Sequence, residues 1–117
     1  ELPDDFAVYS GDDATAVGLM LMGGCGNVSV TANVMPKAMA ELCRLAMAGQ
    51  AREAAALNRW LLPLHRLMFV EPNPVPVKWA LWRMAKIKAG IRLPLVGLSE
   101  THQRELESVL LSLGVCS

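Results

Sequence analysis

The chain has 117 residues, the length of one small domain. Eleven Lys and Arg balance eleven Asp and Glu, so the net charge gives no electrostatic basis for binding nucleic acid or an anionic membrane surface. No apolar run approaches the ~20 residues of a membrane-spanning helix. Hydrophobic residues make up 53% of the sequence, more than a small domain readily buries. This excess favours either an oligomer or a part of a larger protein.

The cysteines and the N-terminal residues of the sequence indicate the cellular compartment of the protein. Cys25, Cys43 and Cys116 are odd in number and lack the CxxC spacing of many metal and redox sites. They favour free thiols in a reducing compartment and predict a cytoplasmic protein. No signal peptide is visible, and because the first residue is Glu1 rather than Met, we expect that further residues precede it.

The first third of the sequence predicts a strand, a helix and a second strand. The apolar run 6–10 predicts a buried strand. Residues 14–22 predict a helix, which a carboxylate of Asp12 or Asp13 caps at its start and a Gly-Gly pair ends. The β-rich run 27–31 predicts the second strand. This order is typical of a βαβ unit with a parallel sheet.

The remainder of the sequence predicts only helices. Apolar residues recur at helical spacing in the segments 35–49, 57–68, 77–90 and 99–114. Pro36 suits the first turn of its helix, whereas Pro63 is expected to bend the second helix or end it early. Ser99 is expected to cap the fourth helix. The three prolines of 71–76 predict an extended path into the third helix.

The two predicted strands are too few for the sheet that they indicate. A parallel sheet needs both faces covered, and two strands followed by helices alone do not provide that. The sequence therefore predicts the C-terminal part of a larger α/β protein. Residues 1–49 are expected to form its last strand–helix units and residues 50–117 a helical domain.

Two turns near the predicted strands are candidates for chemistry. Ser10–Asp13 follows the first strand, at the edge that holds the active site in α/β barrels, although a capped turn is the more common explanation. The Gly-rich turn before the second strand is not a phosphate-binding loop, because no Gly-Lys-Ser/Thr follows. Val28 could offer a ligand only backbone groups, and its side chain is predicted to lie in the core. Cys25 is predicted to be an inert thiol.

The Pro-rich segment is the most distinctive stretch of the chain. It places Asn73 at a rigid bend with a free amide, and a purely structural linker is about as well supported. Lys78 is predicted to face solvent. His65 and His102 have no second ligand at helical spacing, so no metal site is expected.

Four motifs together resemble one family. They are SGDDA, GG-x-G-x-x-SVTANV, PLH-x-x-x-FVEPNP-x-PVKWA and RLPL. In their order and spacing, from about Asp4 to Gly114, they resemble the dihydrodipicolinate synthases. The related N-acetylneuraminate lyases share the architecture but not FVEPNP-x-PVKWA.

The resemblance implies a fold and a chemistry. The fold is a (β/α)8 TIM barrel with a helical C-terminal appendage, of which residues 6–10 and 27–30 would be the seventh and eighth strands. The chemistry is a Schiff-base lyase reaction of lysine and diaminopimelate biosynthesis that needs no cofactor. A lysine forms an imine with pyruvate, and the derived enamine attacks aspartate semialdehyde.

The resemblance also implies which residues touch substrate. The catalytic lysine would lie on the sixth strand, before Glu1, so no catalytic residue is expected in this chain and the chain alone is expected to be inactive. The backbone carbonyl of Val28 would face pyruvate, Gly11 would line the same pocket, and Asn73 would lie in a loop that approaches it. None of the lysines present matches the catalytic one.

The resemblance further implies a homo-oligomer, a dimer of dimers. The helix that carries Leu19, Leu21 and Met22 is apolar on every side, and we expect these residues at a subunit contact. Two alternatives stay open. One is a non-enzymatic helical module that associates through its apolar surface, and the other is a different pyruvate aldolase of the same superfamily.

Overall fold

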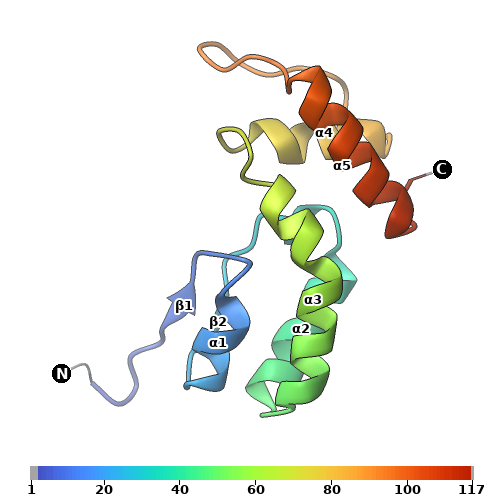
Figure 1. Cartoon of the computed structure of the whole chain (residues 1–117). Coiled ribbons are helices and arrows are strands. Elements are labelled where there is room, and N and C mark those ends of the chain that lie inside the picture. The colour runs from blue at the N-terminus through green and yellow to red at the C-terminus, as the bar shows by residue number, and fades with distance from the viewer. Residues whose placement is uncertain (1–2, 117) are drawn as a thin grey trace.

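The structure is a computed structural model that describes residues 3–116, so residues 1, 2 and 117, the outer ends of the two predicted parts, lie outside the description. The molecule is elongated, with extents of 45 × 30 × 21 Å. Two short strands and α1 form one end, and α4 and α5 form the other (Figure 1). The elements are β1 (Tyr9–Ser10), α1 (Ala16–Leu21), β2 (Gly26–Asn27), the 3-10 helix η1 (Thr31–Asn33), α2 (Pro36–Met47), α3 (Ala51–Leu67), α4 (Val75–Arg83) and α5 (Glu100–Ser112).

The strand–helix–strand order and the parallel pairing are confirmed. Tyr9 lies opposite Gly26 and Ser10 opposite Asn27 in the parallel pair. Both strands are shorter than predicted, and β2 ends early because only three residues separate it from η1. The prediction that the first strand is buried was wrong: Phe6 and Tyr9 are more than half exposed. Within the described residues β1 has only one neighbouring strand.

The two acidic residues before α1 do different things. Oδ2 of Asp12 accepts hydrogen bonds from the backbone N–H of Thr15, at 3.1 Å, and from its hydroxyl, at 2.6 Å. Asp12 thus shapes the turn into α1, whose N-cap residue is Thr15. Asp13 turns inward and is 1% exposed. Neither carboxylate accepts an N–H of the helix itself, so the prediction that Asp12 or Asp13 caps α1 was wrong, and Asp12 binds the N-cap residue instead.

The helix α3 is longer than predicted and passes through Pro63. The sequence pattern led us to expect a bend or an early end there, and that expectation was wrong, because the helix continues to Leu67. Pro63 is exposed, whereas Leu61 and Leu64 on either side of it are fully buried. Their burial, worth roughly 1.5–3 kcal/mol each, outweighs the backbone hydrogen bond that Pro63 cannot donate.

The segment around α4 departs most from prediction. The residues before it do not run extended: the N–H of Val75 donates to the carbonyl of Pro72 at 2.9 Å and closes a turn. The helix then ends at Arg83 rather than near Gly90. Ala85 takes a left-handed φ of 56°, and the N–H of Lys86 donates to the carbonyl of Leu81 at 2.9 Å. This is the Schellman ending that a glycine usually provides, so the sequence signal for it was missing.

The other helix ends follow the sequence closely. Pro36 occupies the first turn of α2, as predicted. Ser99 is the N-cap residue of α5, but its hydroxyl hydrogen-bonds the side chain of His102 instead of capping the backbone. The helix α2 closes at Gly49 and α5 at Gly114, both with left-handed φ.

The core consists of two clusters that share α3. One cluster joins α1, α2 and the first part of α3, with Met20, Leu42 and Leu61 at its centre. The other joins α4, α5 and the end of α3, with Leu64 and Leu106. The helix α3 therefore holds the strand end and the α4–α5 end together. The predicted division at residues 49 and 50 stays a prediction.

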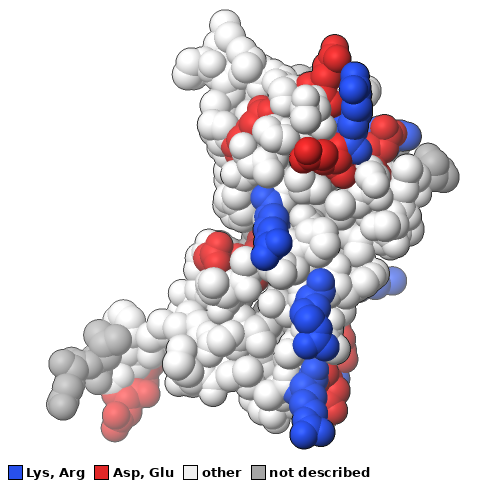
Figure 2. All heavy atoms as spheres, in the orientation of Figure 1, with Lys and Arg blue, Asp and Glu red and all other residues white. Residues whose placement is uncertain are grey.

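Much apolar surface lies at the strand end. Leu21, Met22 and Val28 are exposed there together with Phe6 and Tyr9. Figure 2 shows few charged side chains over β1 and α1, whereas Lys, Arg, Asp and Glu gather along α3 and α5. In residues 3–116 no helix is both long and apolar enough to cross a bilayer.

We predict that the isolated 117-residue chain self-associates. Unpaired strand edges and exposed apolar side chains at one end favour pairing with a second molecule. Sedimentation velocity over a wide range of concentrations should show a species that grows with concentration. A monomer with a cooperative thermal transition at every concentration would contradict this prediction.

Candidate functional site

The ends of the two parallel strands bring Gly11 and Val28 to one edge. The N–H of Val28 donates to the carbonyl of Ser10 at 2.8 Å. The next residues on each strand would normally continue this ladder. They do not: the N–H of Asp12 donates to Oγ of Ser10 at 3.1 Å, and the N–H of Val30 donates to Oδ2 of Asp13 at 3.0 Å. Side chains thus take the place of the next two backbone hydrogen bonds.

The carbonyl of Val28 is consequently free. No N–H or hydroxyl of residues 3–116 donates to it. The side chain of Val28 is 74% exposed, so the prediction that it lies in the core was wrong. Gly11 is exposed as well, and a Cβ built on it would meet nothing within 4 Å. The strand edge therefore offers an open backbone acceptor next to unfilled space.

The buried carboxylate of Asp13 organises this edge. Its Oδ2 accepts the N–H groups of Val30 and Thr31, at 3.0 and 2.9 Å, and its Oδ1 accepts Nδ2 of Asn27 at 2.8 Å. Burial disfavours the charged form, but the Ser29 hydroxyl beside the carboxylate and the hydrogen bonds from Thr31 and Asn27 outweigh it and hold the pKa of Asp13 below its ordinary value. Asp13 is therefore ionised at neutral pH.

A second hydrogen bond links this edge to α3. Oγ1 of Thr31 lies 2.8 Å from Nδ1 of His65, and both side chains are at most 1% exposed. Burial lowers the pKa of His65, and the nearby charge of Asp13 only partly opposes the shift. His65 is therefore neutral at neutral pH. Its Nε2 is buried without a partner in the described part of the chain.

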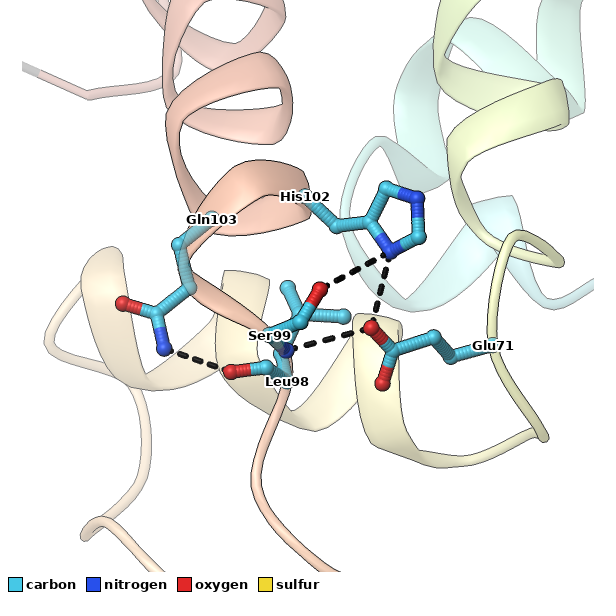
Figure 3. Close-up of polar contacts among 5 residues, drawn as sticks. All are labelled: Glu71, Leu98, Ser99, His102 and Gln103. Atoms are coloured by element: carbon cyan, nitrogen blue, oxygen red, sulfur yellow. Dashed lines mark hydrogen bonds and ion pairs between the residues drawn. The ribbon is translucent and has the colours of Figure 1, made fainter.

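A separate polar cluster holds the loop that carries Asn73. Oε1 of Glu71 accepts the N–H of Ser99 at 3.1 Å and faces Nδ1 of His102 at 2.8 Å. Figure 3 shows Glu71 pointing from its loop toward Ser99 and His102 at the start of α5. Hydrogen bonds from His102 and Ser99 hold the pKa of Glu71 below its ordinary value. The cluster ties the loop before α4 to α5.

This cluster is not a catalytic triad, although it contains Ser, His and Glu. In a triad the serine and the carboxylate bind different ring nitrogens, so that the imidazole can take the serine proton at one nitrogen while the carboxylate orients the ring through the other. Here the hydroxyl of Ser99, at 3.1 Å, and the carboxylate of Glu71 both face Nδ1 of His102. The arrangement fastens two segments and does not activate a nucleophile.

The remaining predicted residues lie apart from the strand edge. Asn73 is exposed in the loop between α3 and α4, which lies above the strand ends in Figure 1. The lysines at positions 37, 86 and 88 are exposed, and Lys78 is half-buried. Lys78 lines a surface cavity of about 250 Å³ together with Trp79 and Trp82. Residues 3–116 contain no group of three or more His, Cys, Asp or Glu side chains placed to hold a metal.

The residues predicted at a subunit contact lie on and just after α1. Leu21 and Met22 are 41% and 82% exposed, and Leu19 is half-buried. Their role in assembly stays a prediction.

Sequence reasoning missed the partnership of Asp13, Thr31 and His65. One signal for it existed, since His65 lies on the same helical stripe as Leu61 and Met68, and a histidine on an apolar stripe needs a buried partner.

A model of the Dihydrodipicolinate synthetase family matches residues 1–113. The chain belongs to the dihydrodipicolinate synthetase family. The 4-hydroxy-tetrahydrodipicolinate synthase of Stutzerimonas stutzeri (strain A1501) is 60% identical over 111 residues, which are 95% of this chain and 38% of that protein. The same-named protein of Marinobacter nauticus is 62% identical over 109 residues, 93% of this chain and 37% of its own length. This chain thus spans less than two fifths of these relatives.

Solved structures of dihydrodipicolinate synthases match the fold closely. The chloride-inhibited enzyme of Acinetobacter baumannii, complexed with pyruvate, has a TM-score of 0.91 at 51% identity, over 94% of this chain and 38% of that one. The Aquifex aeolicus structure has a TM-score of 0.95 at 37% identity, over 97% and 39%. The predicted fold class, the C-terminal part of a (β/α)8 barrel with its helical appendage, is confirmed.

The first prediction from the site concerns His65 and acid stability. Because its folded pKa is lowered, the unfolded chain takes up a proton more readily below the ordinary value of 6.5, so stability is lost as the pH falls through that region. We propose to measure this in a chimera, in which this chain replaces the matching part of the S. stutzeri dihydrodipicolinate synthase. The change His65→Asn keeps a polar group near Thr31 but cannot titrate. Urea denaturation should show a flatter dependence of unfolding free energy on pH in the variant, between about pH 5 and 8, and equal slopes would refute the prediction.

The second prediction concerns the Glu71 cluster. In the chimera, Glu71→Gln should lower the unfolding free energy by about 1 kcal/mol at neutral pH, because two hydrogen bonds lose a charged acceptor. The folded pKa of Glu71 lies below its ordinary 4.5, so the stabilisation is present above that pH and disappears as the pH falls through the lowered value. The matched control is Glu105→Gln, which changes an exposed carboxylate of α5. Equal effects of the two substitutions would contradict a specific role for Glu71.

Proposed function

We propose that this chain is the C-terminal part of a Schiff-base lyase that condenses pyruvate with aspartate semialdehyde. The observation that carries the proposal is the free carbonyl of Val28, next to the open space at Gly11, at the carboxyl edge of two parallel strands. Active sites of α/β barrels form at this edge. The family, and the pyruvate complex of the A. baumannii relative, support pyruvate as the ligand.

In this proposal the chain binds substrate and does not supply the nucleophile. A backbone carbonyl can only accept hydrogen bonds, so the carbonyl of Val28 suits a donor such as the N–H of a protonated imine or the hydroxyl of its carbinolamine precursor. The lysine that forms the imine comes from the part of the protein that this chain does not cover. The four lysines of the chain lie outside the two strands, which agrees with this assignment.

The proposed reaction needs no cofactor beyond the protein. The lysine amine adds to the ketone of pyruvate and water leaves, which gives the imine. Loss of a proton from the methyl group gives an enamine, whose carbon attacks the aldehyde of aspartate semialdehyde. Asn73, in the loop fastened by Glu71, is the proposed third residue to approach the substrate.

We further propose that the whole protein is cytoplasmic and assembles as a dimer of dimers. The exposed apolar residues Leu21 and Met22 support a contact through α1. One similar solved structure is described as a monomeric dihydrodipicolinate synthase variant; it is 43% identical with a TM-score of 0.91. The subunit association of the protein that contains this chain therefore needs its own measurement.

The chimera tests the function directly. Pyruvate and borohydride should add one reduced-pyruvate mass increment to the chimera, because borohydride reduces an imine to a stable amine. The isolated 117-residue chain should gain no adduct. A folded chimera that gains no adduct, or a chain that gains one alone, would overturn the proposal. Turnover with aspartate semialdehyde but not with other aldehydes separates this reaction from that of another pyruvate aldolase.

A further inference from the structure

A hydrogen-bond pattern at the strand edge suggests a role for Asp13. Because Ser10 pairs with Asn27, the geometry of a regular parallel ladder determines which two backbone hydrogen bonds would come next. One would run from the N–H of Asp12 to the carbonyl of Val28, and the other from the N–H of Val30 to the carbonyl of Asp12. Oγ of Ser10 takes the first N–H and Oδ2 of Asp13 takes the second. The carbonyl of Val28 is left free because the ladder stops here.

We infer that Asp13 is a positioning residue, which ends the ladder and holds the segment 28–31 so that the carbonyl of Val28 faces the substrate. The inference rests on the proposed function. Asp13 itself touches no substrate in this assignment: it is 1% exposed and acts through the N–H groups of Val30 and Thr31.

An ionised carboxylate suits this position better than any neutral side chain. Three donors converge on it, the N–H groups of Val30 and Thr31 and Nδ2 of Asn27. A carboxylate offers only acceptors, and its charge strengthens each hydrogen bond. An asparagine there would keep one oxygen for the N–H groups of Val30 and Thr31 and turn its N–H₂ group toward Asn27, whose Oδ1 is buried without a partner in the described part of the chain. It would lack the negative charge that strengthens the two backbone hydrogen bonds, so the segment 28–31 would be held less firmly.

His65 braces the same segment through the side chain of Thr31. Through Oγ1 of Thr31, at 2.8 Å, it fixes the first residue of η1 to the helix α3. Asp13 holds the backbone of Thr31 and His65 holds its side chain. Thr31 is fully buried and therefore has little freedom to follow a displaced strand end. The position of Val28, three residues earlier, is thus set from two directions.

The test is made in the chimera and compares Asp13→Asn with Asp5→Asn. The control changes an exposed carboxylate that lies outside the strand pair and its turn. For Asp13→Asn we expect the KM for pyruvate to rise about tenfold, the factor for loss of one good hydrogen bond. We expect kcat to fall much less, because the lysine and its proton transfers are untouched. The control should leave both constants unchanged.

A second pair of variants covers the case in which Asp13→Asn fails to fold. Thr31→Val removes the hydroxyl at nearly constant volume, and Thr31→Ser retains it. A raised KM for pyruvate in Thr31→Val and a normal one in Thr31→Ser would support the inference. A loss of thermal stability with an unchanged KM, in Asp13→Asn or in Thr31→Val, would show that the network is only structural and would overturn it.

The outcome for the unmodified chimera separates this inference from the proposed function. If the unmodified chimera traps no pyruvate with borohydride, the proposed function fails and this inference fails with it. If it traps pyruvate and the Asp13 and Thr31 variants keep a normal KM, only the inference fails.

Discussion

The buried carboxylate of Asp13 is the constraint on which the strand end of the molecule depends. It satisfies the buried N–H of Thr31 and the partly buried N–H of Val30 and amide of Asn27, and a buried donor left without a partner costs about 1–3 kcal/mol. The same bonds turn the chain from β2 into η1, so they determine where α2 begins and how it meets α1. A single ionised group thus sets both the local backbone and the packing of the first core cluster. Its burial is tolerable only because every donor around it is engaged.

The long helix α3 connects the strand end of the molecule to the rest of the chain. Its first part packs in the cluster of α1 and α2, and its last part packs against α4 and α5. His65 lies between these parts and binds Thr31 beneath the strand edge. The loop that follows α3 carries Asn73 and is fastened to α5 by Glu71. The segment that carries Val28 and the loop that carries Asn73 are therefore both attached to α3, although they are far apart in sequence.

The sequence predicted the parts of the fold that depend on local chemistry. The parallel strand pair, the first turn of α2 and the N-cap of α5 all follow from residue types with strong local preferences. Predictions failed where tertiary packing overrode such preferences. Pro63 does not end α3, because buried leucines on both sides hold the helix. Ala85 ends α4 in a conformation that usually needs glycine, so no residue type marked that end. At the site, Gly11 and Val28 were predicted from a family resemblance. The hydrogen bonds of Asp13 could not be predicted without knowing which N–H groups the ladder leaves unpaired.

The exposure of Val28 follows from the same argument. A barrel strand has its side chains covered on both faces, yet here the described chain covers β1 and β2 mainly with α1, α2 and each other. What the chain presents at the strand edge is a backbone acceptor on a rigid support, without an amine nearby. An acceptor alone cannot make or break a carbon–carbon bond, but it can orient a group that carries a proton. In the proposed function, substrate orientation is therefore the part of the chemistry assigned to these residues, and the reactive amine would come from the part of the protein that this chain does not cover.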